Sequence, residues 1–193
     1  SIIQSAVKTD KLWDGHHSDD LKDALGVGLD RNQNLNLFIR NFADLVKLPE
    51  PNRKLIDLNK LVTSVVTLME LRAFEKDVKL IAQLNPMPVN ISADEQQMEQ
   101  VLINIVNNAI EAIGENGEVK LSVSLMPRQL IISDTGKGIS REQSEQLFTP
   151  FFTTKKDGQG IGLTLVREIL VNHAFEFSLK TVAPRQTEFT INF

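Results

Sequence analysis

The chain has 193 residues, of which 41% are hydrophobic and 24% charged, a composition typical of a soluble globular protein. Its net charge of −4 and the lack of a long basic run disfavour nucleic-acid binding through a basic patch. The absence of cysteine excludes a disulfide, a thiolate zinc site and a cysteine nucleophile, and it fits a cytoplasmic location.

The sequence contains no apolar run of membrane-spanning length and no recognisable signal peptide. It starts at Ser1 rather than at methionine. We therefore expect a fragment of a longer protein, for example one with a membrane sensor upstream.

The first part of the chain predicts a helical hairpin. Residues 1–13 are mildly amphipathic, residues 14–20 form a turn-rich break, and a second helix can run over residues 19–48. Two prolines end it, at positions 49 and 51. Its apolar residues have the 3-4-3 spacing of a coiled-coil seam: Leu35, Phe38, Phe42 and Leu45. Such a seam packs against a second chain or against its own domain.

The rest of the chain predicts an α+β fold, a two-layer sandwich in which helices cover one face of a mixed sheet. Helices are expected over residues 59–75, 92–113 and 160–172. Strands are expected over residues 78–84, 88–91, 118–125, 129–133, 176–182 and 187–193. The third and fourth strands are expected to be antiparallel neighbours, and the last two to form a hairpin around Pro184.

The helix over residues 92–113 has two distinct faces. Ser92 and Glu95 have capping-box spacing, so the helix is expected to start there. Apolar residues recur at helical intervals: Met98, Val101, Leu102, Ile105, Ala109 and Ile113. The other face stacks polar residues one turn apart: Gln100, Asn104, Asn108 and Glu111. This polar face is either solvated or the wall of a nucleotide pocket, with an amide oxygen as a Mg²⁺ ligand.

Three loop motifs follow this helix. A short apolar strand runs into Asp134-Thr-Gly136-Lys-Gly138. Next come Phe148-Thr-Pro-Phe-Phe-Thr-Thr-Lys155 and Gly158-Gln-Gly160-Ile-Gly162-Leu163, and the latter opens another helix. A single glycine loop is usually a turn, but four motifs in this order within roughly seventy residues are specific.

The four motifs resemble the N, G1, F and G2 boxes of the sensor histidine kinase ATP-binding domain. That domain belongs to the superfamily of DNA gyrase B, Hsp90 and MutL. The resemblance covers about residues 55–193 and implies ATP and Mg²⁺ as cofactors. It implies a kinase catalytic domain over residues 55–193, preceded by a partial dimerisation hairpin over residues 1–54.

The resemblance implies a role for each motif. Asp134 matches the aspartate that accepts a hydrogen bond from the adenine amino group, although an aspartate before glycine is often only a turn cap. Asn108 matches the Mg²⁺-binding asparagine. Residues 139–159 are expected to form a lid. The residues expected to contact the nucleotide are Asn104, Asn108, Glu111, Asp134, Gly136, Gly138, Ile139, Phe148, Thr153, Thr154, Lys155, Gly158, Gly160, Ile161, Gly162 and Leu163.

The position of Asn104 separates two kinds of chemistry. In gyrase-like relatives it is a glutamate that activates water, whereas an amide cannot act as a general base near pH 7. We therefore expect poor ATP hydrolysis and transfer of the γ-phosphoryl group to a docked nucleophile. The expected catalytic residues are Asn104, Asn108 and Lys155.

The hairpin resembles the histidine kinase dimerisation hairpin, which pairs into a four-helix bundle and implies a homodimer. Its exit, residues 42–59, is similar to that of NtrB- and NtrY-like kinases. The family's phosphoacceptor is a histidine followed by an acidic residue on the first hairpin helix. None of His16, His17 and His173 matches that motif, and residues 1–6 resemble the stretch just downstream of it.

The sequence thus predicts the catalytic region of a two-component sensor histidine kinase whose partner is a response regulator. Two alternatives remain open. One is a serine kinase of the anti-sigma type, which would lack the hairpin. The other is a nucleotide-binding dimerisation scaffold without catalytic activity.

Overall fold

The computed structural model describes four stretches of the chain, residues 25–29, 32, 48–155 and 160–193. No helix in these stretches combines the length and the apolarity needed to cross a bilayer. The chain divides into two compact units, residues 1–47 and residues 48–193.

The described residues of the first unit are helical. The predicted seam and two of the histidines lie outside the described residues, namely Leu35, Phe38, Phe42, Leu45, His16 and His17. The dimerisation hairpin over residues 1–54 therefore stays a prediction.

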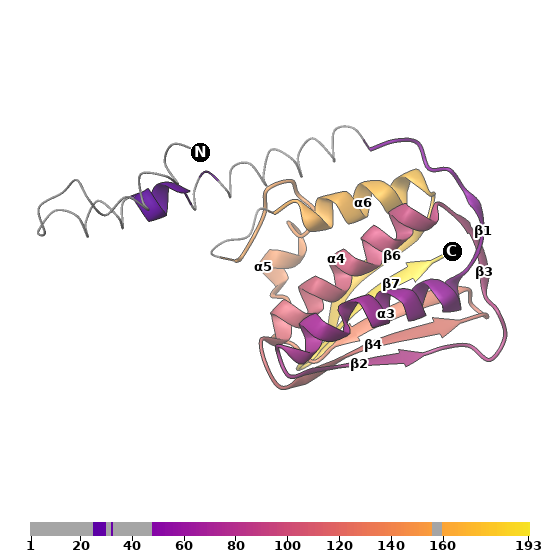
Figure 1. The fold of residues 1–193 in the computed structure, drawn as a ribbon, viewed down its shortest axis with the longest axis horizontal. Coiled ribbons are helices and arrows are strands. Elements are labelled where there is room, and N and C mark those ends of the chain that lie inside the picture. The colour runs from indigo at the N-terminus through magenta and orange to yellow at the C-terminus, as the bar shows by residue number, and fades with distance from the viewer. Residues whose placement is uncertain (1–24, 30–31, 33–47, 156–159) are drawn as a thin grey trace, which may run out of the picture. The chain divides into compact units, whose positions relative to one another are not determined.

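The second unit is a two-layer α+β sandwich, as predicted (Figure 1). In chain order its elements are β1 (Lys54–Asp57), α3 (Leu58–Phe74), β2 (Val78–Gln83), β3 (Asn90–Ala93), α4 (Glu95–Ile113), β4 (Gly117–Ser124), β5 (Gln129–Asp134), α5 (Arg141–Ser144), α6 (Gly162–Asn172), β6 (Glu176–Ala183) and β7 (Gln186–Asn192). The main sheet has the order β2-β4-β5-β7-β6. It is mixed, because β2 and β4 are parallel and the other neighbours antiparallel.

The core lies between this sheet and the layer formed by α3, α4 and α6 (Figure 1). Alternate residues of the central strands point into it, as the period of two in an extended chain requires. They are Val119, Leu121, Val123, Leu130, Ile132, Phe189 and Ile191. Every predicted apolar stripe residue of α4 is buried except Ile113, which is half-buried.

A small antiparallel ribbon pairs β1 with β3. A strand was predicted over residues 88–91, which overlaps β3, but no strand was predicted over β1. Lys54–Asp57 is too short and too polar to show a clear alternation of its own. It is a strand because it pairs with Asn90–Ala93. The ribbon connects the start of the unit to the N-terminal end of α4.

The predicted start of α4 at Ser92 is wrong. Ser92 lies in β3 opposite Leu55, and the N-cap is Asp94. The Asp94 carboxylate accepts a hydrogen bond from the Gln97 N–H at 3.1 Å, which satisfies a free amide of the first helical turn. Aspartate and serine are both good caps, and strand pairing decides between them.

His173 joins the N-terminal end of α4 to the C-terminal end of α6. The residue is 1% exposed, and Nδ1 of its ring donates to the Ile169 carbonyl at 2.8 Å. Nε2 accepts the Asp94 N–H at 3.0 Å, so the ring must be neutral to keep both bonds. Burial is the main cause that lowers the pKa of His173 below its usual value.

This pKa shift predicts a loss of stability in weak acid. The folded chain binds fewer protons at His173 than the unfolded chain, so the free energy of unfolding falls as the pH drops below about 6.5. For one group the slope is at most about 1.4 kcal/mol per pH unit. Urea unfolding at pH 7.5 and 5.5 measures it. A His173→Gln variant should be less stable at pH 7.5 but less sensitive to pH, and an equal pH sensitivity would contradict this assignment.

Candidate functional site

The polar face of α4 borders the start of α6. Asn104 Nδ2 donates to the Gln100 carbonyl at 2.9 Å, which fixes the orientation of its amide. A Cβ atom placed on Gly162 would lie 3.0 Å from Asn104 Oδ1. A side chain at Gly162 would therefore crowd the Asn104 amide.

Asp134 ends β5 on the face of the sheet that the helices cover. It is 9% exposed, and its Oδ1 accepts the Gly136 N–H at 2.8 Å. Burial raises the pKa of Asp134 above its usual value, while the hydrogen bond from Gly136 acts in the opposite direction. Within the described residues, Oδ2 accepts no hydrogen bond and is available to an outside donor.

Thr187 stands directly opposite Asp134 in the β5–β7 pair, which places both side chains on the same face. It is 4% exposed, and its Oγ1 has no hydrogen-bond partner within the described residues. A buried hydroxyl without a partner is costly unless a ligand or water satisfies it. Sequence reasoning missed Thr187, although it continues the alternation of Phe189 and Ile191.

The loop after Asp134 lies between α4 and β6. The Lys137 N–H donates to the Ala112 carbonyl at 3.2 Å. Two residues later, the Ile139 N–H donates to Thr181 Oγ1 at 2.8 Å. Between them, Gly138 has a positive φ of 80°. The loop thus forms one border of the site, and Asp134 is buried at its start.

Within the stretch predicted as a lid, residues 139–159, Phe151 contacts the residue that follows this stretch, Gly160. The Phe151 N–H donates to the Gly160 carbonyl at 3.0 Å. Gly160 has a φ of 66°, and a Cβ there would lie 2.4 Å from the Phe151 carbonyl carbon, so only glycine fits. Phe148 packs edge to face on Phe177 at 5.3 Å, which anchors the segment around Phe148 to β6 of the sheet.

The first turn of α6 begins at Gly162, two residues after Gly160. Its N-cap residue is Ile161, and no side chain in the described part of the chain caps it. Its first amides and the positive end of the helix dipole are therefore open to an anion. Gly162 and Leu163 are the first two helical residues. Gly158 lies outside the described residues, and its predicted contact stays a prediction.

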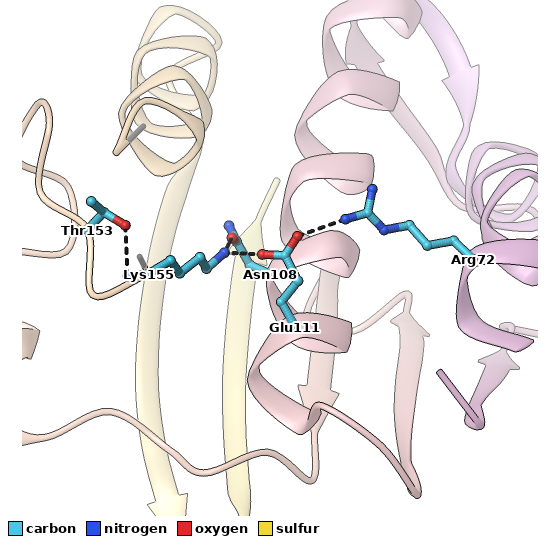
Figure 2. A network of polar contacts seen from close by, with 5 residues as sticks. All are labelled: Arg72, Asn108, Glu111, Thr153 and Lys155. Atoms are coloured by element: carbon cyan, nitrogen blue, oxygen red, sulfur yellow. Dashed lines mark hydrogen bonds and ion pairs between the residues drawn. The ribbon is translucent and has the colours of Figure 1, made fainter. Parts of the chain in front are cut away.

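A charged network crosses the polar face of α4 (Figure 2). Lys155 Nζ donates to Asn108 Oδ1 at 2.8 Å and also contacts Glu111 Oε2. Glu111 Oε1 accepts a hydrogen bond from Arg72 Nη2 of α3 at 2.7 Å. The Lys155 N–H donates to Thr153 Oγ1 at 3.1 Å, while Thr154 is exposed.

The structure therefore brings the predicted residues together in three groups. Asn108, Glu111 and Lys155 share one network. Asn104 faces Gly162 at the start of α6. Asp134 and Gly136 form a buried acceptor with Thr187 beside it. Phe148 belongs to none of these groups, because it packs on the aromatic rings of β6 and β7.

Comparison with known families assigns the chain that carries this site to a family. Residues 93–193 match the family model described as histidine kinase-, DNA gyrase B-, and HSP90-like ATPase. The chain belongs to this ATPase family. The matched residues include α4, β5, the predicted lid and α6, so every predicted site residue lies within the family's domain. Arg72 of α3 lies outside the matched range.

Curated relatives of this ATPase-family chain include sensor kinases. Sensor histidine kinase ZraS of Salmonella typhimurium is 33% identical over 180 residues, which are 92% of this chain and 38% of ZraS. Sensor protein FixL of Bradyrhizobium diazoefficiens is 34% identical over 140 residues, 70% of this chain and 28% of FixL. The chain thus spans well under half the length of these relatives.

Solved structures of histidine kinases share the fold. The catalytic domain of histidine kinase ThkA covers 72% of this chain and 93% of its own, with a TM-score of 0.66 and 30% identity. ThkA in complex with the response regulator protein TrrA covers 98% of this chain and 55% of its own, with a TM-score of 0.72 and 26% identity.

Proposed function

We propose that the chain is the ATP-binding catalytic region of a two-component sensor histidine kinase. The observation that carries this proposal is Asn104, a neutral amide beside the start of α6. It cannot take a proton from water near pH 7, so the site favours transfer to a docked nucleophile over hydrolysis. The sequence similarity to ZraS and FixL also supports phosphoryl transfer to a docked nucleophile.

We assign the adenine base to Asp134 and Thr187. Asp134 Oδ2 is the acceptor for the exocyclic amino group, and Gly136 holds Oδ1 in place. The unpartnered Thr187 Oγ1 supports a ligand or an ordered water next to this carboxylate. Guanine offers a carbonyl oxygen in place of the amino group and would meet the carboxylate acceptor to acceptor.

The phosphates belong at the start of α6, where free amides and the helix dipole favour an anion. Asn108 Oδ1 and the Glu111 carboxylate converge on a single cation, the Lys155 ammonium, so their oxygens fit a hard divalent ion. When bound, Mg²⁺ would neutralise phosphate charge. The described residues contain no cluster of three or more histidines, cysteines or acidic residues for a metal, so the ion is expected to arrive with ATP.

The acceptor in this reaction is a histidine ring of the kinase. A ring nitrogen attacks the γ-phosphorus, the bond to the β–γ bridging oxygen breaks, and ADP leaves. His173 is unsuited to this role, because it is buried and both its nitrogens are hydrogen-bonded. We assign the acceptor to a helix of the dimerisation hairpin, which makes the working kinase a homodimer.

The phosphorylated kinase would pass its phosphoryl group to a response regulator. The complex of ThkA with TrrA, whose kinase shares this fold, supports such a partner. We place the domain in the cytoplasm, where ATP and the regulator are found, and allow for a membrane anchor elsewhere in the parent protein.

Phosphotransfer in trans tests the proposal. The chain is incubated with γ-labelled ATP alone, and then with a longer form of the protein that carries the acceptor helix and Asn108→Ala. We expect no label on the chain, little free phosphate, and acid-labile label on the longer form. Acid-stable label would indicate a serine kinase, rapid phosphate release would indicate an ATPase, and bound ATP without any transfer would indicate a scaffold.

A further inference from the structure

Glu111 lies between two cations that come from opposite sides of α4. Arg72 of α3 binds Oε1, and Lys155 of the lid binds Oε2 (Figure 2). Asn108, one turn earlier on α4, directs Oδ1 at the same ammonium group. Two oxygens of different side chains therefore converge on one positive charge.

A metal ion can replace the Lys155 ammonium beside Asn108 and Glu111. Lys155, Glu111 and Arg72 are each between about one third and one half exposed, so water screens their attraction and their separation costs little. A divalent cation prefers oxygen ligands and would bind the same pair, Asn108 Oδ1 and Glu111 Oε2, more strongly than an ammonium does. The ammonium and the metal cannot occupy this point together.

Arg72 determines which oxygen of Glu111 faces Lys155. Its guanidinium binds Oε1 at 2.7 Å and leaves Oε2 to the ammonium that Asn108 Oδ1 also contacts. Without Arg72, once Lys155 is displaced, nothing described in the structure would fix the rotation of the carboxylate. Arg72 is therefore a positioning residue, which acts through Glu111 and touches no ligand itself.

We propose that Glu111 is a second oxygen ligand of the nucleotide-bound Mg²⁺, positioned by Arg72, and that Lys155 occupies this cation site until the metal arrives. The displaced Lys155 is then free to contact the phosphates, which couples metal binding to the position of Lys155. This inference rests on the proposed function, because it takes the divalent cation to arrive with ATP.

Calorimetric ATP titrations at a series of Mg²⁺ concentrations test the role of Glu111. Glu111→Gln keeps the size of the side chain but removes its charge. We expect the Mg²⁺ concentration that gives half of the gain in ATP affinity to rise on the order of tenfold. Affinity for metal-free ATP should be unchanged or tighter, since a negative charge near the phosphates is lost. The matched control is Glu115→Gln, an exposed site just beyond α4, which should behave like the parent.

Two further measurements test Arg72 and Lys155. Arg72→Gln should shift the Mg²⁺ dependence in the same direction, Arg72→Lys should restore it, and Arg72→Gln should add nothing in the Glu111→Gln background. Lys155→Met should increase the binding of Mn²⁺ to the nucleotide-free chain, measured by the loss of the free Mn²⁺ spin-resonance signal.

The outcomes separate this inference from the proposed function. If the parent binds no ATP, the proposed function fails. If the parent binds Mg-ATP but Glu111→Gln has the parent's Mg²⁺ dependence in a folded chain, Glu111 is not a ligand and only this inference fails. Unchanged Mn²⁺ binding in Lys155→Met would show that Lys155 does not occupy the cation site.

Discussion

Replacing Asp134 by asparagine should weaken ATP binding by on the order of 1–3 kcal/mol, or about 5- to 150-fold in Kd. Asparagine keeps the shape of the side chain, and its amide oxygen can still accept the Gly136 N–H. Its NH₂ group then replaces the free carboxylate oxygen and meets the adenine amino group donor to donor. Calorimetry on the folded variant measures the loss.

The same residue predicts a pH effect on ATP binding. Because burial raises the pKa of Asp134, this carboxyl takes up a proton at a higher pH than an ordinary aspartate. ATP affinity should therefore fall as the pH drops, and Asp134→Asn should remove this part of the dependence. Asp77→Asn is the matched control, since Asp77 is exposed and has a φ of 51° that asparagine also accepts. An Asp134→Asn variant with parental affinity would exclude the adenine contact.

Replacing Asn108 by alanine should abolish the Mg²⁺ dependence of ATP affinity. The change removes the neutral oxygen that now accepts a hydrogen bond from Lys155 and leaves Glu111 alone on α4. Metal-independent binding should be weaker or unchanged, because the adenine contacts and the start of α6 are not altered. Titrations of ATP with Mg²⁺ and with a chelator measure the difference.

The neighbouring residue provides the control for this experiment. Asn107 lies one position earlier on α4, and its side-chain oxygen is buried without a partner in the described part of the chain. Asn107→Ala should keep the parental Mg²⁺ dependence. If Asn108→Ala also keeps it, the metal is bound by the phosphates and other residues, and Asn108 has no part in the site.

Most elements of the sandwich could be predicted because their signals are local. The apolar stripe of α4 follows the helical period, and β4 and β5 alternate as half-buried strands do. The polar face of Asn104, Asn108 and Glu111 follows from the same period. Asp134 was recognisable because its glycines are adjacent in the sequence.

The missed features depend on contacts between distant segments. Thr187 belongs to the site only because it pairs with Asp134 across the β5–β7 ladder. The sequence of β7 alone does not show this pairing. Arg72 reaches Glu111 because α3 packs beside α4, although 39 residues separate them. The N-cap of α4 moved from Ser92 to Asp94 because β3 pairs with β1. Spacing along the chain indicates each residue's face, whereas packing decides its partner.

The most direct test of the account compares ATP with GTP. We assign the base to Asp134, whose free carboxylate oxygen accepts the adenine amino group and repels the guanine carbonyl. Calorimetric titration of the chain with each nucleotide in excess Mg²⁺ should show one site that prefers ATP by at least about tenfold. Equal affinity for ATP and GTP, or no binding of ATP by the folded chain, would contradict it.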